Sequence, residues 1–245
     1  MRLKKKTLEH IFWGFSAIML ALGLYFSYKN VSFKAKIENK VQEEIKKSLS
    51  EELLSIEKTL KAIKETAVSL AKKLGAEKMS KGDIEKLLQE SLKQNPNLVG
   101  VGAAFEPSII DEKTKLFAPY YQIENNKVLS TPITYDYTQP SKSKFKPDVN
   151  WYTTPLSKGE AWSDPYYVAK KRAVIGEYAI AVHKGNGPKG KPLGIVFVNF
   201  NLNAITNRIS YLNLGKTGYG FLLSKKGTII SHYMNEYVSE QKNNC

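Results

Sequence analysis

The sequence predicts an α+β protein in which helical segments precede an antiparallel sheet. Apolar residues recur at steps of three or four up to Leu74, which is the spacing of a helix. After Asn97 the chain changes to short runs rich in β-branched and aromatic residues, which are typical of strands. Residues 202–212 return to helical spacing before a last pair of β-rich runs. Helices and strands are therefore grouped along the chain, which favours the α+β class.

Length and composition exclude several classes of protein. The 245 residues suffice for one or two domains, and 42% hydrophobic residues can build a core, which excludes a disordered protein. The single cysteine, Cys245, can form neither an intramolecular disulfide nor a cysteine metal cluster. His10, His183 and His232 lack the short spacing of a metal motif, so we expect no metal site and treat His183 and His232 as structural.

Residues 11–28 contain no charged side chain and approach the length of about 18–20 apolar residues that crosses a bilayer as a helix. We therefore predict a cytoplasmic tail at residues 1–10, a transmembrane helix at 11–28 and an exported remainder. The Lys and Arg residues on the two sides favour this orientation only slightly. A cleaved signal peptide is the alternative, but large residues occupy the place of its cleavage site, which favours an uncleaved anchor.

Residues 29–75 are predicted to form one long amphipathic stalk helix. From Leu53 onward the apolar steps alternate between three and four, which is the heptad spacing of a coiled-coil seam. The seam comprises Leu53, Ile56, Leu60, Ile63, Ala67 and Leu70. It could pair with a second copy of the chain in a homodimer, or it could pack on the protein's own domain, and the spacing fits both.

Capping signals mark the end of this helix and the start of the next one. Gly75 stands where a C-cap glycine would end the long helix. Ser80 and Asp83 resemble a capping box that opens a second helix through Lys93. The segment Asn95-Pro96-Asn97 then ends the second helix.

Seven β-rich runs follow, separated by turn signals. They cover residues 98–105, 117–123, 127–133, 172–182, 193–200, 219–224 and 227–233. Asn125-Asn126 and Lys225-Lys226-Gly227 are candidates for hairpin turns, and residues 185–192 form a longer loop rich in Gly and Pro. We therefore predict that these runs are antiparallel strands.

Several of these segments carry motifs that are specific for a known family. They are NPNLVGVGAAFEP (95–107), APYY (118–121), YDY (135–137), WYTTPLSKGEAWSDPYY (151–167), GIVFVNFNL (194–202) and GYGFLLSKKGTIISH (218–232). Through these motifs residues 30–233 resemble a double Cache, or PDC-like, sensor domain. Such domains are extracytoplasmic ligand-binding modules of bacterial chemoreceptors, sensor histidine kinases, cyclases and membrane phosphatases.

The resemblance implies a PAS-like antiparallel sheet and an order of parts after the membrane anchor. These parts are the stalk helix at 29–75, a membrane-distal Cache module at 76–214 and a partial membrane-proximal module at 215–245. It also implies a single-pass protein of the inner (plasma) membrane whose sensor domain is extracytoplasmic. Because the chain shows no second apolar span, we expect a sensor without its output domain, either a natural truncation or a fragment.

The C-terminal hairpin of the partial module is expected at residues 218–233. A two-stranded hairpin is marginal by itself in water. We therefore expect it to dock on the long helix through Phe221, Leu223 and Ile229, or else to remain mobile. Residues 236–245 are expected to be disordered.

An aromatic cluster indicates where a ligand would bind. It consists of Tyr120, Tyr121, Tyr135, Tyr137, Trp151, Tyr152, Trp162, Tyr166 and Tyr167. Tyr and Trp rings cover the apolar parts of a small molecule, while their polar ends contact its polar atoms. The resemblance places Trp151, Tyr152 and Tyr167 at pocket positions, and we add Tyr135 and Asn199 to this predicted ligand site. Tyr120 and Trp162 are more typical of core residues.

The two charged anchors of the amino-acid-binding subfamily are missing here. The resemblance aligns Val149 with its carboxylate-binding Arg and Asn199 with its ammonium-binding Asp. Neither replacement can form the full ion pair, so we expect standard free α-amino acids to bind poorly and another small molecule to be the ligand. Lys170, Lys171 and Arg172 give an acid-binding alternative, although such a charge run is more typical of a hairpin tip that faces water.

The sequence contains no phosphate-binding loop, nucleophile elbow or kinase-like motif, so we predict neither enzymatic activity nor a cofactor. A small-molecule sensor is the preferred function. The alternatives are a non-signalling remnant or anchored extracytoplasmic interaction protein, and a binder of anionic polymer or organic acid that uses the net charge of +14. The even spread of this charge disfavours polymer binding, and we expect no nucleic-acid partner.

Overall fold

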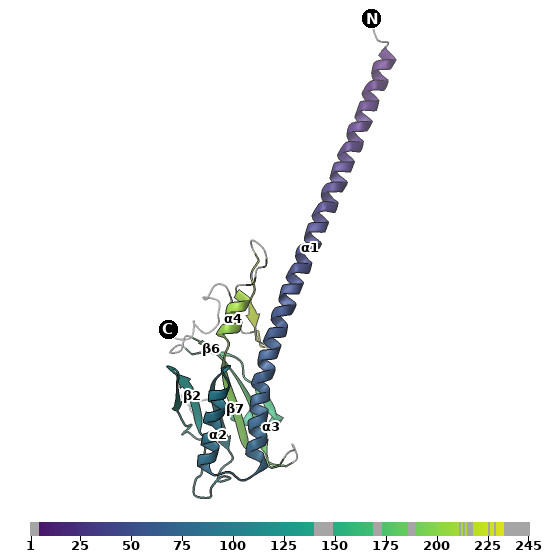
Figure 1. Cartoon of the computed structure of the whole chain (residues 1–245). Helices are drawn as coiled ribbons and strands as arrows, with labels where there is room; N and C mark the ends of the chain where they lie inside the picture. Colours follow the sequence, from purple (N-terminus) through teal and green to yellow (C-terminus); the bar gives the residue numbers. More distant parts are fainter. Residues whose placement is uncertain are drawn as a thin grey trace, which may run out of the picture. The chain divides into compact units, whose positions relative to one another are not determined.

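The computed structural model describes residues 5–139, 149–168, 173–185, 190–210, 212, 214, 218–224, 226–227 and 229–232 (Figure 1). Its contacts divide the chain into two units, residues 1–51 and 52–245. Helix α1, Lys5–Ala76, contributes to both units. The other elements are α2 (Lys81–Gln94), β1 (Leu98–Phe105), β2 (Tyr120–Glu124), β3 (Lys127–Ser130), α3 (Asn150–Lys158), β4 (Glu160–Trp162), β5 (Tyr166–Val168), β6 (Ala173–His183), β7 (Pro192–Asn201), α4 (Asn203–Ser210), β8 (Leu222–Leu223) and β9 (Ile229–Ser231).

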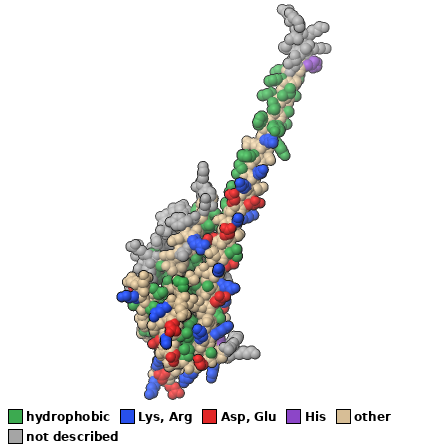
Figure 2. Space-filling view, in the orientation of Figure 1, with side chains coloured by type: hydrophobic (Ala, Val, Ile, Leu, Met, Phe, Trp, Pro, Cys, Tyr) green, Lys and Arg blue, Asp and Glu red, His purple; other side chains and the backbone are tan. Residues whose placement is uncertain are grey.

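The first unit consists of the N-terminal part of α1. Its large apolar side chains between Phe12 and Tyr28 are exposed, and Figure 2 shows hydrophobic side chains along this part of the helix. Within the described part of the chain, no helix combines the length and the apolar character that a membrane crossing needs. The transmembrane helix predicted at 11–28 is therefore not confirmed. Residues 1–4 of the predicted cytoplasmic tail lie outside the described residues.

The second unit is built on a seven-stranded sheet with the order β3-β2-β1-β7-β6-β4, in which β5 also pairs with β6. All of these pairs are antiparallel, which confirms the predicted α+β class. The longest predicted runs correspond to the central strands β1, β7 and β6.

Helix α3 was not predicted from the sequence, since it contains Pro155 and has no side-chain cap at Val149. Strands β4 and β5 were not predicted either, because three residues are too few to show the alternation of apolar and polar side chains that marks a strand.

Two local signals in the sequence correspond to the observed elements. The backbone N–H of Asp83 donates a hydrogen bond of 3.2 Å to the Ser80 hydroxyl, and α2 begins directly after this cap. Asn125 and Asn126 both have positive φ, 51° and 59°, and join the paired ends of β2 and β3. Such a two-residue loop matches the twist of a hairpin, so the predicted turn is confirmed.

The predicted C-cap role of Gly75 is wrong. Helix α1 continues through Ala76, and Gly75 lies inside it. A Cβ atom at Gly75 would overlap the carbonyl oxygen of His183 at the end of β6. The carbonyl oxygen of Gly75 also accepts a hydrogen bond of 2.7 Å from the N–H of Gly185. Glycine is therefore needed here because the chain after β6 passes close to the helix backbone.

The heptad seam of α1 packs against the protein's own domain. Most of its residues belong to, or pack against, a buried core that also contains residues of α2 and of one sheet face; these are Ile56, Leu60, Ile63, Ala67 and Leu70. We call this the helix-side core. Leu53, at the start of the seam, is 55% exposed. Of the two predicted partners for the seam, intramolecular packing is therefore confirmed from Ile56 onward.

The C-terminal hairpin, β8 and β9, docks differently from the prediction. Phe221 is 52% exposed and Leu223 is 46% exposed, so neither side chain is buried against the long helix. Instead Ile230 is 8% exposed within the helix-side core, and β9 contacts α4. The exposure of Phe221 and Leu223 contradicts the prediction for these two residues. Ile229, the third predicted residue, is half-buried, and Ile230 is the apolar residue that β9 buries. The disordered segment predicted at 236–245 lies outside the described residues.

Candidate functional site

The sheet face opposite to the helix-side core carries most of the predicted aromatic cluster, whereas Tyr121 and Trp162 lie on the helix side. Side chains alternate along a strand, so on β7 Phe197 and Asn199 share this face, whereas Val198 and Phe200 lie on the helix side. A separate core lies on this face and contains Ala104, Ala118, Tyr137, Tyr152, Ala179, Ile195 and Phe197, with Tyr120, Tyr135 and Trp151 partly buried against it. We call it the aromatic-side core.

Two glycines of β1 make room for aromatic rings on this face. A Cβ atom at Gly102 would overlap the ring of Phe197, and one at Gly100 would overlap the hydroxyl end of Tyr120. The rings of Tyr120 and Phe197 are stacked, with centroids 5.6 Å apart. Because Gly100 and Gly102 have no side chains, the rings of Tyr120 and Phe197 lie directly on the backbone of β1. We call this strip of β1 the trough.

Trp151 and Tyr135, two of the predicted site residues, are in direct contact. The indole N–H of Trp151 donates a hydrogen bond of 3.0 Å to the Tyr135 hydroxyl. The indole ring also meets the Phe197 ring edge to face, with centroids 5.2 Å apart. Helix α3 positions Trp151 over the sheet, where its ring is half-buried. These three side chains form one aromatic wall of the candidate site.

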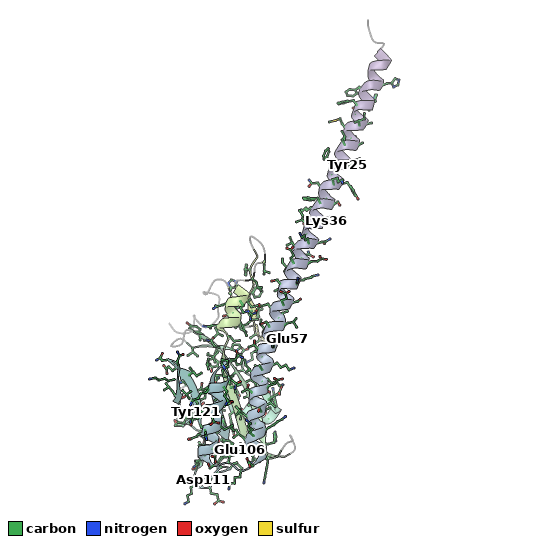
Figure 3. All side chains as sticks on the ribbon, in the orientation of Figure 1. Tyr25, Lys36, Glu57, Glu106, Asp111 and Tyr121 are labelled. Carbon is green, nitrogen blue, oxygen red and sulfur yellow. The ribbon has the colours of Figure 1, made fainter. Side chains whose placement is uncertain are left out.

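Tyr152 supports this wall from inside the core. The side chain is 1% exposed, and its ring lies 4.8 Å from that of Tyr137, centroid to centroid. Its hydroxyl donates a hydrogen bond of 2.6 Å to Glu106, which is labelled in Figure 3 and also pairs with Lys191 at 3.5 Å. Burial, with the bond to Glu106, raises the pKa of Tyr152 above its usual range. The polar end of this tyrosine is thus already engaged within the protein.

The register of β5 separates Tyr167 from the other predicted site residues. Tyr166 pairs with Ile175 of β6, and Tyr167 pairs with Val174. Since Ile175 and Glu177 are two residues apart, both lie on the aromatic side, and so does Tyr166. The alternation directs Tyr167 to the helix side instead. The structure therefore brings Tyr166, and not Tyr167, to the face that carries Asn199.

Asn199 is paired with a carboxylate that the sequence analysis did not identify. Asn199 is 3% exposed, and its side-chain N–H donates a hydrogen bond of 3.0 Å to Oε2 of Glu177 on the adjacent strand β6. Burial raises the pKa of Glu177 to about 7, although the bond from Asn199 acts in the opposite direction. One signal was present in the sequence, because Glu177 is the only acidic residue within the otherwise apolar run of β6.

Tyr120 and Tyr166 lie near this carboxylate. Burial is the main cause of the raised pKa of Tyr120, and the electrostatic effects of Tyr166 and Glu177 add to it. The hydroxyl end of Tyr120 lies over Gly100, which is paired with Asn199 across β1 and β7. Aromatic rings, phenol groups, an amide and a carboxylate are therefore gathered on this face of the sheet.

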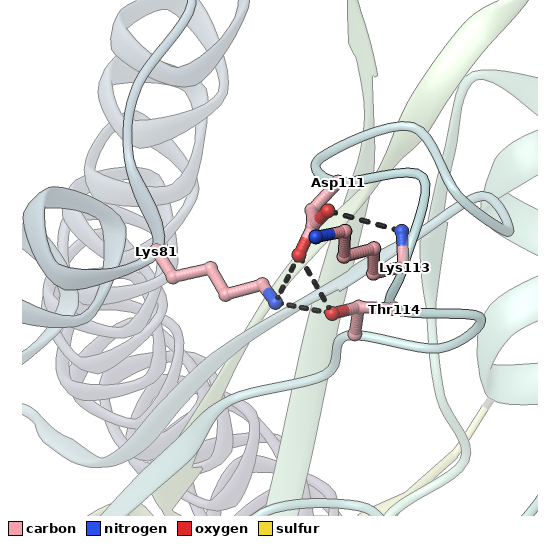
Figure 4. A network of polar contacts seen from close by, with 4 residues as sticks. All are labelled: Lys81, Asp111, Lys113 and Thr114. Carbon is pink, nitrogen blue, oxygen red and sulfur yellow. Dashed lines mark hydrogen bonds and ion pairs between the residues drawn. The ribbon is translucent and has the colours of Figure 1, made fainter.

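A second polar cluster, shown in Figure 4, has a structural role. The Lys81 ammonium lies 2.9 Å from the Asp111 carboxylate, which also accepts hydrogen bonds of 3.0 Å from the Lys113 N–H and the Thr114 hydroxyl. These contacts, the Lys81 bond first, lower the pKa of Asp111 to about 2. The cluster ties the start of α2 to the loop after β1.

Two further sequence predictions concern ions. The acid-binding alternative at Lys170, Lys171 and Arg172 lies outside the described residues. Among the residues that the structure describes, no group of three or more His, Cys, Asp or Glu side chains is placed to hold a metal ion.

Comparison with known proteins gives both a family and structural neighbours. The family described as methyl-accepting chemotaxis protein-like, first PDC sensor domain, matches residues 84–207. Methyl-accepting chemotaxis protein X is similar in structure, with a TM-score of 0.66 and 20% identity, over 83% of this chain and 78% of that chain. No curated protein sequence matches the chain.

Two further solved structures have the same fold. The extracellular domain of soHK1S-Z6, named as a histidine kinase, aligns with a TM-score of 0.62 and 21% identity, over 83% of this chain and 74% of that chain. The ligand-binding domain of the Pseudomonas aeruginosa PAO1 amino acid chemoreceptor PctC, in complex with GABA, aligns with a TM-score of 0.55 and 18% identity. That alignment covers 78% of this chain and 75% of the PctC chain.

Proposed function

The chain belongs to the family of methyl-accepting chemotaxis protein-like PDC sensor domains, and from this premise we propose that it binds a small molecule on the aromatic side of its sheet. The observation that carries this proposal is the convergence of the Trp151–Tyr135 wall and the buried Asn199 on one face. Tyr166 takes the place of Tyr167 in the proposed site, and Tyr152 supports the wall. The chain then acts by binding a ligand and not by catalysis, as a sensor family does.

Standard free α-amino acids are proposed to bind poorly. Val149 is buried, at 5% exposed, and its side chain offers no hydrogen-bond donor to a carboxylate. The relative PctC is named as an amino acid chemoreceptor and was solved with GABA, so small amino compounds belong in any screen.

A thermal-shift screen of the full chain in detergent micelles tests the proposed function. The panel comprises amino acids, organic acids, amines, alcohols and purines. A ligand at about 100 times its Kd stabilises the native state by about 2.7 kcal/mol, which raises the melting temperature measurably. The Trp151→Ala variant should lose this shift. Trp162→Ala is the matched control, because Trp162 packs on Tyr178 at the helix side. A panel without any Trp151-dependent ligand would contradict the proposal.

We further infer that residues 11–28 anchor the chain in the inner membrane, with the sensor domain extracytoplasmic. The support is the absence of charged residues in this stretch and the exposure of its large apolar side chains around the helix. A helix that is apolar all round needs a nonpolar environment, such as a bilayer. The relative soHK1S-Z6 is an extracellular domain.

The anchor is tested by adding protease to intact spheroplasts that express the full chain. The protein is expected in the membrane fraction, and the protease should digest the residues after Lys29. Leu20→Lys should weaken membrane association, whereas Lys36→Leu, outside the stretch, should not. A domain that stays protected from the protease would overturn the topology.

The proposed homodimer through the long helix is restricted to residues outside the helix-side core. Leu53 and Leu54 are 55% and 65% exposed, whereas the later seam residues are buried in the helix-side core or half-buried against it. Sedimentation of the full chain in detergent should show a dimer that Leu53→Lys weakens. A monomer at every concentration would contradict the proposed homodimer.

A further inference from the structure

The strongest unexplained feature of the molecule is the pair formed by Glu177, which is half-buried, and Asn199, which is buried. The two residues face each other across β6 and β7, and the Asn199 amide binds only one carboxylate oxygen, Oε2, at 3.0 Å. Among the described residues, no side chain donates a hydrogen bond to the other oxygen, Oε1. One acceptor atom of a largely buried carboxylate is therefore available to a further donor.

The carboxylate of Glu177 also has no positive partner within residues 149–168 and 173–185 or the other described ranges. None of the Lys and Arg side chains in the described part of the chain forms an ion pair with it. Its backbone is held separately, since the Glu177 N–H donates to the Ser163 hydroxyl at 3.2 Å. A buried charge without a counter-charge is costly, and it becomes favourable when a cation with hydrogen-bond donors pairs with it.

Aromatic rings near Glu177 can contact the apolar part of such a cation. Tyr120 reaches over Gly100 from one side, and Tyr166 shares the face from β5 on the other. Burial, followed by the electrostatic effects of Tyr166 and Glu177, raises the pKa of Tyr120. Aromatic rings attract ammonium groups through their faces and cover the attached carbon chain.

We propose that Glu177 is the anchoring residue for a primary ammonium group, so that the ligand of the aromatic-side site is a small amine. This inference rests on the proposed function, since it names the ligand class of the same site. The carboxylate that is missing at position 199 is supplied by the adjacent strand, with Asn199 holding it in place. Because the buried Val149 offers nothing to a ligand carboxylate, an amine without a carboxylate fits better than an α-amino acid.

The pairing makes ligand binding depend on pH. Glu177 must be ionised to hold an ammonium group, and its pKa of about 7 in the free protein means that acid competes with the ligand. Tyr120 and Tyr166 face the same patch, and the pKa of Tyr120 is raised above its usual range by burial. Asp164, in the loop before β5, is paired with Lys226 at 4.0 Å. Alkylamines stay cationic over this range, as lysine does, so Glu177 is the group that sets the dependence.

Calorimetry on the full chain in detergent micelles tests the proposal. The probes are the primary amines from ethylamine to hexylamine, each compared with the alcohol and the carboxylate of equal chain length. At pH 8 at least one amine should bind about 30-fold or more tightly than its alcohol, the factor expected for a buried charge pair. Between pH 8 and pH 6 the affinity of that amine should fall about tenfold, because the ionised fraction of Glu177 falls by that factor.

Variants complete the test. Glu177→Gln keeps the shape and the bond to Asn199, and it should lower amine affinity by about 30-fold or more. Glu90→Gln, the same change on the exposed side of α2, should leave the affinity unchanged. Equal binding of an amine to Glu177→Gln, or no binding of any amine, would overturn the proposal. If a different compound then gives a Trp151-dependent thermal shift, the proposed function stands and only the amine assignment fails.

Discussion

The two faces of the central sheet are built from alternate residues of the same strands, yet they differ in chemistry. The helix side is filled mainly by aliphatic side chains of α1, α2 and the strands, including Leu70, Leu88 and Val198, together with a few aromatic rings such as Phe200. The aromatic side combines rings with polar groups that point into the layer, such as Trp151 and Asn199. On the aromatic side these polar groups are paired with each other, as Trp151 is with Tyr135 and Asn199 is with Glu177. The contrast fits the proposal that the helix side stabilises the fold and that the aromatic side binds the ligand.

Two glutamates make the same contrast. Glu160 lies on the helix side, where the Lys64 ammonium at 2.6 Å and the Tyr178 hydroxyl at 2.8 Å lower the pKa of its carboxyl group. Glu177 lies on the aromatic side, where burial raises the pKa. Among the residues that the structure describes, a cation therefore pairs with Glu160 and none pairs with Glu177. This difference is the basis for proposing that Glu177 pairs with a ligand.

The largest effect on stability is expected from shortening a buried side chain of the helix-side core. Leu88 is fully buried, and Leu88→Ala should lower the free energy of unfolding by about 2–5 kcal/mol, because it leaves a cavity in a close-packed core. Leu129→Ala, at a position that is 39% exposed, is the matched control and should cost far less. Urea denaturation of the full chain in micelles measures both. Similar losses for the two variants would contradict the assignment of stability to the helix side.

A smaller loss is expected from filling the trough of the aromatic side. Gly102→Ala would push a methyl group into the ring of Phe197 and should cost about 1–3 kcal/mol of unfolding free energy. Adding Phe197→Leu should recover part of this loss, which a double-mutant cycle measures. Gly82→Ala, in the open first turn of α2, should be neutral or stabilising. A trough variant as stable as this control would refute the close contact.

The smallest effect, and the sharpest contrast, is the pH dependence of the two glutamates. Because the folded pKa of Glu177 is raised to about 7, its ionisation destabilises the fold progressively as pH rises from its ordinary value of 4.5. Glu177→Gln should therefore raise the free energy of unfolding at pH 8 by on the order of 1 kcal/mol, and little at pH 4.

Glu160 should show the opposite sign. Its folded pKa is lowered, so its stabilisation is present above the pKa of the unfolded chain and is lost as pH falls through the folded value. Glu160→Gln should therefore lower the melting temperature at pH 7 and have little effect in acid. Melting curves between pH 4 and pH 8 compare the two variants. Parallel curves would show that the two faces do not differ in this respect.

The sequence by itself determined the features that depend on neighbours along the chain. Ser80 placed the start of α2, and Asn125-Asn126 placed a hairpin, since a cap and a turn are formed within a few residues. The β-rich runs gave the main strands, and the family motifs gave the class of sensor domain. The aromatic cluster suggested that Trp151 and Tyr135 belong to one site, and the structure shows that their side chains are hydrogen-bonded, although α3 was not predicted.

Only the tertiary structure decided which residues share a face and meet there. A shift of one residue in a strand moves every side chain to the other face, so Tyr166 could replace Tyr167 only once the pairing of β5 with β6 was known. The spacing of the seam on the long helix fitted both a second copy of the chain and the protein's own domain, and the helix-side core shows that it packs on the domain from Ile56 onward. Glu177 and Asn199 are 22 residues apart, and only the register of β6 with β7 brings the amide to the carboxylate. Caps and turns can be predicted from a few neighbouring residues. A site made of several strands depends on strand register, which is set by packing between residues far apart in the sequence.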